Sequence, residues 1–235
     1  MSRGVGEFGV VQDIIPDSLA LLVALLTQLG DIWFVSLLLI ALFVRFDRDR
    51  IATVAGLAIG AIALVFALKH LFALPRPNEP LIALEALPSL VQPIYAATGY
   101  SGGYGFPSGH AALTTVVYLS LAETLSVRAK QRQYIGAVTV ITLVSLSRIA
   151  LGLHYLVDVL AGIALGIAFL LLARHLLDRY RSANRRTVSL GLGAFLAALS
   201  VLASGGHSEP LVLFVGAVMI FSLSWFFDSS RTTPA

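Results

Sequence analysis

The sequence contains no cysteine and carries little charge. Only 12% of its 235 residues are Asp, Glu, Lys or Arg, whereas soluble domains carry about 25%. The lack of cysteine excludes disulfides, thiol catalysis and cysteine-based zinc sites. Because 57% of the residues are hydrophobic and the mean hydropathy is +0.88, the low charge indicates an integral membrane protein.

The net charge of +3 and the pI near 9.4 do not indicate nucleic-acid binding. The basic residues lie in short segments between apolar runs, where they set the orientation of membrane helices. We therefore expect no nucleic-acid partner. The N-terminus does not predict a clear signal peptide, because Arg3 is its one early cation and Glu7 and Asp13 follow it.

Apolar runs predict six membrane spans, or seven if a run near 210–227 also crosses. A preceding stretch, Leu19–Leu29, is too short to cross alone, so we expect it to lie at the interface, to re-enter, or to begin one long tilted helix. The predicted fold is an all-α bundle with an N-terminal segment (1–29), a core (30–180) and a C-terminal helix pair with a short tail (181–235). The six spans lie near residues 30–45, 51–74, 109–126, 134–152, 155–175 and 188–204.

Most Lys and Arg residues fall on one side of the membrane if the predicted spans alternate. The positive-inside rule predicts that this side is cytoplasmic. The opposite, extracytoplasmic side then holds one end of each of four consecutive spans and the long connection 75–107, in which we expect a short surface helix over 81–91. The basic clusters are Arg45, Arg48 and Arg50, then Arg128, Lys130 and Arg132, and then Arg174, Arg179, Arg181, Arg185 and Arg186.

The first polar block lies at the predicted outer end of the second span. Lys69 is followed by Arg76, which stands between Pro75 and Pro77. Proline on both sides ends the helix and restricts the backbone, and a guanidinium held in this way suits bidentate contact with phosphate oxygens. Taken separately, Lys69 could simply extend to the membrane interface and Arg76 could be an ordinary loop residue.

The second block, Pro107-Ser108-Gly109-His110, opens the third span. Ser108 suits an N-cap, and a helix N-terminus attracts anions through its free N–H groups and its dipole. Gly109 allows close approach to the backbone, and His110 falls on the first helical turn. The alternative is a simple cap followed by an interfacial histidine.

The third block joins the fourth and fifth spans. Arg148 follows Ser147 near the outer end of the fourth span, where a buried arginine without an anionic partner is costly. His154 and Asp158 are four residues apart at the predicted start of the fifth helix, so they share a face and can touch. A carboxylate on one imidazole nitrogen leaves the other free to attack. The alternative is a polar pair that joins helices.

Lys69-x6-Arg76-Pro77, Pro107-Ser108-Gly109-His110 and Ser147-Arg148-x5-His154-x3-Asp158 together resemble the three signature blocks of the type 2 phosphatidic acid phosphatase (PAP2) superfamily. That superfamily includes membrane lipid phosphatases, undecaprenyl-diphosphate phosphatases, glucose-6-phosphatase and the soluble vanadium haloperoxidases. The blocks span residues 69–158, so the N-terminal region and the last two candidate spans lie outside them.

The resemblance implies a role for each residue of the blocks. His154 would attack phosphorus and form a phosphohistidine, Asp158 would orient it, and His110 would protonate the leaving oxygen. The phosphoryl oxygens would be bound by Lys69, Arg76, Ser108, Gly109 and Arg148. The resemblance implies neither a metal nor another cofactor.

More than one activity fits this site. The leading hypothesis is a phosphatase that acts at the outer interface on a lipid phosphate or diphosphate, such as polyprenyl diphosphate, phosphatidic acid or phosphatidylglycerol phosphate. A phosphotransferase or head-group synthase would pass the phosphoryl group to an alcohol instead of water. An anion-binding transporter would not need both histidines and the carboxylate, and the spans disfavour a haloperoxidase. The oligomeric state is left open.

Overall fold

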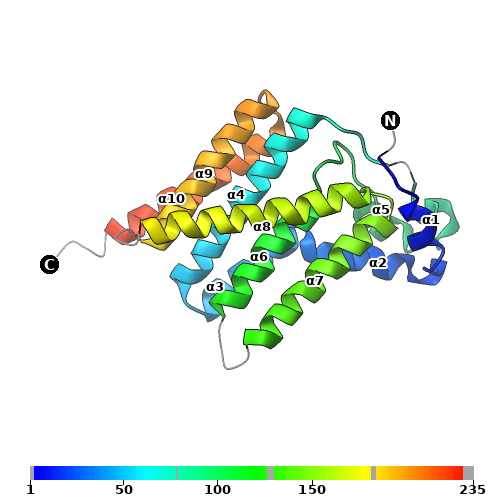
Figure 1. Ribbon diagram of the computed structural model, residues 1–235, viewed down its shortest axis with the longest axis horizontal. Coiled ribbons are helices and arrows are strands. Elements are labelled where there is room, and N and C mark those ends of the chain that lie inside the picture. Colours follow the sequence, from blue (N-terminus) through cyan, green and yellow to red (C-terminus); the bar gives the residue numbers. More distant parts are fainter. Residues whose placement is uncertain (1–2, 78, 126–129, 181–183, 230–235) are drawn as a thin grey trace.

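The structure is a computed structural model that describes residues 3–77, 79–125, 130–180 and 184–229. Within these ranges all regular secondary structure is helical and there is no strand (Figure 1). Short 3₁₀ helices occur at Asp17–Leu19, Thr27–Gly30 and Leu84–Ala86. The α-helices are α1 (Glu7–Gln12), α2 (Ala20–Leu26), α3 (Ile32–Arg45), α4 (Arg48–Phe72), α5 (Gln92–Gly99), α6 (Gly109–Thr124), α7 (Lys130–Ala150), α8 (Leu156–Arg179), α9 (Arg185–Ser204) and α10 (Ser208–Ser229).

The all-α membrane fold predicted from the apolar runs is confirmed. Five described helices, α4, α7, α8, α9 and α10, are long and apolar enough to cross a membrane. A sixth span is possible if Asp17–Gly30 and Ile32–Arg45 act as one, although the chain bends by 56° between them. The helix α6 has only 16 residues, fewer than the ~20 that span a bilayer, and it packs centrally against α4, α7 and α8.

The bend before α3 follows from its two boundary residues. Gly30 is buried against α6 and α7, where an added Cβ would lie 2.8 Å from Val144 Cγ1. The next residue, Asp31, caps α3 by accepting a hydrogen bond from the Trp33 N–H. A new helix therefore begins at this point instead of continuing the first one.

Glycines set the closest helix contacts, as small residues commonly do between membrane helices. A Cβ on Gly56 of α4 would lie 2.5 Å from the backbone of Ser189 in α9, and one on Gly60 would meet Phe169 of α8. A Cβ on Gly162 of α8 would lie 2.5 Å from the carbonyl oxygen of Ser108. Contact between backbones thus holds α8 against the start of α6.

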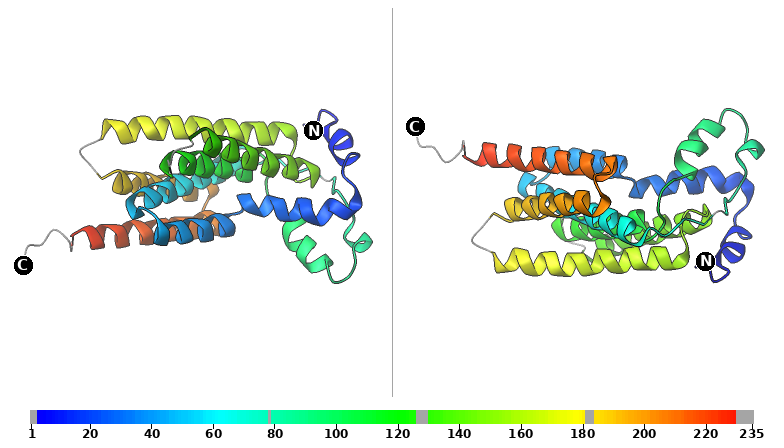
Figure 2. Two further views of the ribbon diagram at one scale, coloured as in Figure 1. Left: turned by 90° about the horizontal axis from the view of Figure 1, so that it is seen from below. Right: turned by 90° about the horizontal axis from the view of Figure 1, so that it is seen from above.

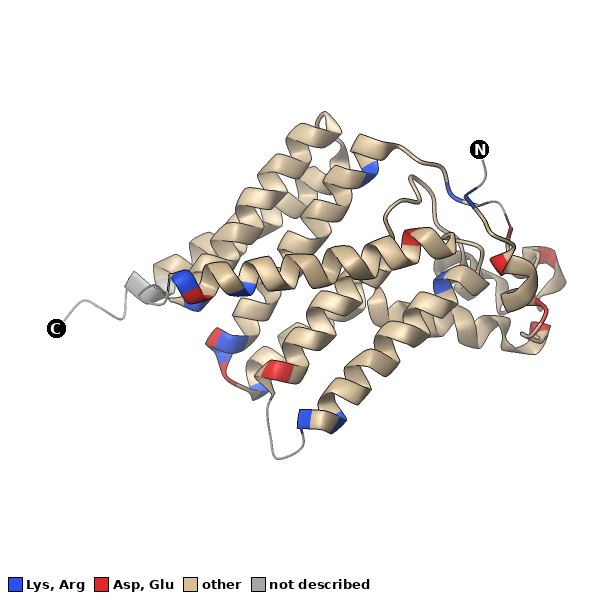
Figure 3. Cartoon of the chain, viewed as in Figure 1, with Lys and Arg blue, Asp and Glu red and all other residues tan. Residues whose placement is uncertain are grey.

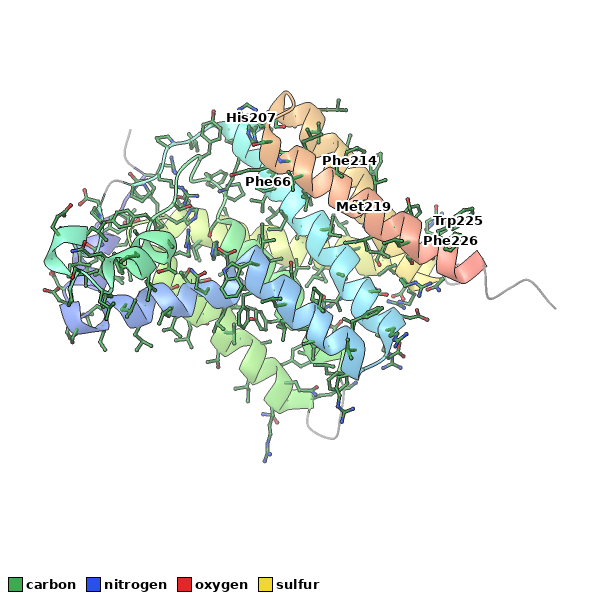
Figure 4. All side chains as sticks on the ribbon, turned by 180° about the vertical axis from the view of Figure 1, so that it is seen from behind. Phe66, His207, Phe214, Met219, Trp225 and Phe226 are labelled. Carbon is green, nitrogen blue, oxygen red and sulfur yellow. The ribbon has the colours of Figure 1, made fainter. Side chains whose placement is uncertain are left out.

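The helix α10 forms one side of the bundle and is apolar on its outer face. Met219, Trp225 and Phe226 are at least 60% exposed there (Figure 4). Its inner face contributes Ala217 to a small cluster with Ala63 and Ala197. Exposed apolar side chains along a span are what a lipid-facing helix requires.

Basic residues gather at one end of the bundle, as predicted (Figure 3). We call this the basic end: α3, α6 and α8 finish there, and α4, α7 and α9 begin there. Of the predicted cluster residues, Arg128 and Arg181 lie outside the described ranges. Ion pairs join the helices at this end: Arg174 to Glu123 at 2.7 Å, Arg186 to Asp49 at 2.6 Å and Arg185 to Asp178 at 3.1 Å.

The connection 75–107 lies at the opposite end, together with α1, α2 and α5 (Figure 2). The prediction of a helix over 81–91 is wrong: that stretch contains only the 3₁₀ helix Leu84–Ala86, and α5 begins after it. Pro88 explains the shift, because proline lacks the N–H that a helix interior needs, whereas Pro93 is tolerated in the first turn of α5. Tyr95 anchors α5 in a buried cluster with Ala20 and Ala24 of α2.

Candidate active site

The eight residues of the three sequence blocks to which a role was assigned gather at the end of the bundle opposite the basic end, which we call the motif end. Lys69 lies in the last turn of α4, Arg76 follows that helix, and the second block begins α6. Arg148 lies in the last turn of α7. Asp158 lies in the first turn of α8, and its backbone oxygen accepts a hydrogen bond from the Ser108 N–H at 2.9 Å. Four helices of alternating direction therefore bring the blocks together.

His154 is almost fully enclosed, with 1% of its surface exposed. It lies in the loop before α8 and not on the helix, which corrects the predicted helical start. The loop turns at Gly152, which has φ 66°, and the N–H groups of Leu153 and His154 both donate to the Arg148 carbonyl. Burial and the cations Arg148, Arg76 and Lys69 lower the pKa of His154 well below its ordinary value.

Arg76 determines which nitrogen of His154 carries the proton. Its Nη1 lies 2.9 Å from His154 Nε2 and also donates to the Leu153 carbonyl, while its Nε donates to the Gly102 carbonyl. A guanidinium can only donate, so Nε2 must accept and the proton of the neutral ring lies on Nδ1. Burial lowers the pKa of Arg76 to about 10, so it stays charged near pH 7. The unshared electron pair of His154 thus points at the Arg76 guanidinium.

Asp158 is fully buried, and its closest partners are groups other than His154. Its Oδ2 accepts from the Tyr155 N–H at 3.0 Å, and its Oδ1 forms an ion pair with Arg3 Nη2 at 3.1 Å. His154 Nδ1 is 3.7 Å from Oδ2, which is close enough for charge interaction but too long for a hydrogen bond. The predicted proximity of the pair is confirmed, and a direct hydrogen bond is absent.

The start of α6 forms as the second block predicts. Ser108 is buried and caps the helix by accepting from the Ala111 N–H at 3.4 Å. His110 follows in the first turn, and its Nε2 lies 3.6 Å from Asp31 Oδ2. Gly109 leaves room at the helix start, since an added Cβ would lie 3.3 Å from Val65.

Arg148 is buried, with 3% of its surface exposed, as its position in the fourth span predicts. Its Nη1 donates to Thr27 Oγ1 at 3.2 Å, and its Nε has no hydrogen-bond partner in the described residues. Lys69 lies within Coulombic range of both Arg148 and Arg76. None of these three cations forms an ion pair with a carboxylate in the part of the chain that the structure describes. They leave net positive charge that an anion would neutralise.

Sequence reasoning missed the contribution of the N-terminal segment. Arg3, Thr27 and Asp31 reach Asp158, Arg148 and His110 respectively. Asp31 did carry a signal, because aspartate after glycine and before an apolar run is a typical N-cap. Nothing in the sequence around Arg3 indicates a partner 155 residues away.

The described residues contain no group of three or more His, Asp or Glu side chains that could hold a metal ion. Two clefts, of about 580 and 490 Å³, lie at the basic end and not at the motif end. Arg186 and Asp49 line both. The residues of the sequence blocks and these two clefts therefore lie at different ends of the molecule.

The model of the PAP2 superfamily matches residues 50–182, and the chain belongs to this superfamily. The chain is 38% identical over 101 residues to lipid A 4'-phosphatase of Porphyromonas gingivalis, a match that covers 42% of this chain and 38% of that protein. It is 33% identical over 90 residues to phosphatidylglycerophosphatase B of Bacillus subtilis, covering 36% of this chain and 44% of that protein. The matches thus span less than half the length of either relative.

A solved structure, that of Aquifex aeolicus LpxE, has a similar fold. The TM-score is 0.52 at 27% sequence identity, and the alignment covers 72% of this chain and 96% of the other. The resemblance read from the three sequence blocks is thereby confirmed at the level of family and fold.

Proposed function

We propose that the protein is an integral membrane phosphatase that hydrolyses a lipid phosphate or diphosphate through a phosphohistidine. The observation that carries the proposal is the contact between Arg76 and Nε2 of the buried, neutral His154. A phosphoryl group bound by Arg76 would lie beside the nitrogen that attacks it. Positioning of this kind supplies much of the rate enhancement in phosphoryl transfer.

The reaction follows from the positions of the groups. Nε2 of His154 attacks phosphorus, the N–P bond forms and the bond to the leaving oxygen breaks. The resulting imidazolium keeps its Nδ1 proton near Asp158, whose charge stabilises it. His110 gives a proton to the leaving oxygen. Water then attacks phosphorus, the N–P bond breaks and inorganic phosphate leaves, while Lys69, Arg76 and Arg148 stabilise the charge on the phosphoryl oxygens.

The relatives support a lipid substrate. Two of them are named for the phosphate of lipid A and for phosphatidylglycerophosphate. A site at helix ends suits such substrates, because the head group can reach it while the tail stays in the bilayer. Candidate substrates are polyprenyl diphosphate, phosphatidic acid and phosphatidylglycerol phosphate. Transfer to an alcohol instead of water is the second candidate, since the same phosphohistidine would serve it.

The test is phosphate release by the purified protein from these lipid phosphates, with and without an alcohol acceptor. His154→Ala is expected to abolish release. His175→Ala is the matched control, because that histidine is exposed on α8 near the basic end. Turnover by His154→Ala at the wild-type rate would overturn the nucleophile assignment. A phosphorylated alcohol as the main product would identify a transferase.

We also propose that the motif end faces away from the cytoplasm, following the positive-inside rule. Because the chain has no cysteine, a single introduced cysteine reports its own side of the membrane. Ser101→Cys, exposed at the motif end, should react with an impermeant thiol reagent added outside whole cells. Gln131→Cys, exposed at the start of α7, should react only after the cells are opened. The reverse pattern would invert the orientation.

A further inference from the structure

The residues just before α3 form part of the wall around His110. The Tyr118 hydroxyl donates to the Leu29 carbonyl at 2.8 Å and so ties this segment to α6. Gly30 then packs so tightly that an added Cβ would lie 2.9 Å from Thr114 and 3.3 Å from the His110 ring. These contacts hold the next residue, Asp31, at a defined position beside the ring. The segment lies outside residues 50–182, which the family model matches.

The geometry of Asp31 divides its carboxylate between two tasks. Oδ1 accepts from the Trp33 N–H at 3.3 Å and caps α3. Oδ2 faces His110 Nε2 at 3.6 Å. That nitrogen is buried and has no hydrogen-bond partner in the described residues. The Asp31 side chain is 35% exposed and the His110 side chain is 19% exposed. Both side chains therefore border the site, and neither is fully buried in the core.

The burial of His110 and the charges around it disfavour the protonated ring that a proton donor needs. Arg148, Lys69 and Arg76 all lie within Coulombic range of the ring, and each positive charge disfavours the imidazolium. Asp158 is already engaged by Arg3 and by the Tyr155 N–H. Asp31 is the carboxylate that contacts His110 in the described residues, and an adjacent negative charge favours the protonated ring.

We propose that Asp31 is a positioning residue for His110. It orients the His110 ring and keeps on that ring the proton that passes to the leaving oxygen. The inference rests on the proposed phosphatase function. In the first step the proton moves from His110 to the leaving oxygen as the P–O bond breaks, and the ring becomes neutral. In the second step His110 recovers a proton from the attacking water as the N–P bond breaks, so the cycle balances.

Asp31→Asn tests this directly, because asparagine also caps helices well and removes only the charge. Two substrates separate proton donation from binding: a long-chain alkyl phosphate, whose alkoxide leaves only with a proton, and p-nitrophenyl phosphate, whose leaving group needs none. We expect kcat/KM, which reports the steps up to departure of the leaving group, to fall at least about tenfold with the alkyl phosphate and to change by less than about threefold with the aryl phosphate. Asp47→Asn is the matched control, since Asp47 caps α4 at the basic end, and neither rate should change.

A second measurement uses phenyl phosphate, which has a leaving group of intermediate basicity. Asp31→Asn should slow its hydrolysis in the wild-type background but not in His110→Ala, because a residue that acts through His110 has no effect without it. Equal losses with alkyl and aryl substrates, or additive losses with His110→Ala, would overturn the assignment in favour of a structural role. A rise in kcat/KM would also overturn it, by showing that Asp31 merely repels the substrate. If the wild type releases phosphate neither from these substrates nor from the lipid phosphates and diphosphates named above, the proposed function itself fails, and the role of Asp31 with it.

Discussion

Arginine side chains lie at both ends of the bundle, but their surroundings differ. At the basic end, three of them pair with carboxylates of neighbouring helices: Arg174 with Glu123, Arg185 with Asp178 and Arg186 with Asp49. At the motif end, Arg3 pairs with Asp158, but Arg76 and Arg148 contact a histidine, a hydroxyl and backbone carbonyls. Surface pairs contribute little, about 0–1 kcal/mol each, whereas a buried cation without a counter-charge is costly. The motif end therefore has a deficit of negative charge that a phosphate group would supply.

Close backbone contact at a glycine occurs toward both ends, at Gly56 against Ser189 and at Gly162 against the Ser108 carbonyl. The ion pairs that join α4, α6, α8 and α9 to one another lie at the basic end, whereas at the motif end the Gly162 contact joins α8 to the start of α6. Side-chain pairs tolerate small displacements, but backbone contact at a glycine does not. A site that must hold several groups in register benefits from the stiffer kind of contact.

The largest contrast is expected between Arg148→Ala and Arg185→Ala. Loss of Arg148 should lower kcat/KM at least about 100-fold, because in the proposed mechanism this buried side chain donates to the developing phosphoryl charge. Loss of Arg185, whose side chain is 54% exposed, should change kcat/KM by less than about twofold. Steady-state phosphate release measures both. Similar losses in the two variants would remove the functional distinction between the ends.

Glycine substitutions test the stiffness of the motif end. Gly162→Ala should destabilise the protein by about 1–3 kcal/mol, since the new Cβ meets the Ser108 carbonyl. Gly136→Ala is the control: Gly136 lies on α7 with nothing within 4 Å of an added Cβ, so the change should be neutral or slightly stabilising. Thermal unfolding in detergent reports the difference. Equal melting temperatures would contradict the close packing of α8 on α6.

Arg3→Ala should lower kcat about tenfold, because the buried Asp158 would lose the cation that holds it charged beside His154. Arg3→Lys keeps the charge and should restore part of the rate. The two variants are compared by phosphate release at saturating substrate. A wild-type rate for Arg3→Ala would show that the N-terminal contact is not needed for turnover.

The smallest effect expected is on the pH dependence of stability. The pKa of His154 is lowered in the folded protein, mainly by burial, so below about pH 6.5 the unfolded chain takes up a proton that the folded one does not. The free energy of unfolding should then fall with decreasing pH, by up to about 1.4 kcal/mol per unit from this residue. His154→Gln should lose less stability than the wild type between pH 7 and 5.5, measured by thermal unfolding. Parallel losses would contradict the lowered pKa.

Much of the site could be predicted from local sequence. The spacing from Lys69 to Arg76 places both at one helix end, and Ser108 carries the signal of an N-cap that the structure confirms. Residues that act locally are visible in this way because capping and helix termination depend on neighbours in the chain. The position of His154 was less visible, because Gly152 ends α7 in a turn and shifts the start of α8 beyond the histidine.

The sequence by itself determined the membrane class, the all-α fold, the common end of the basic clusters and the residues of the three blocks. Each of these depends on composition, on periodicity or on residues close together in the chain. Only the tertiary structure decided that Arg3 meets Asp158, that Thr27 meets Arg148 and that Asp31 faces His110. Such contacts depend on how helices pack against each other, and that packing is set by close approaches such as those of Gly30 and Gly162.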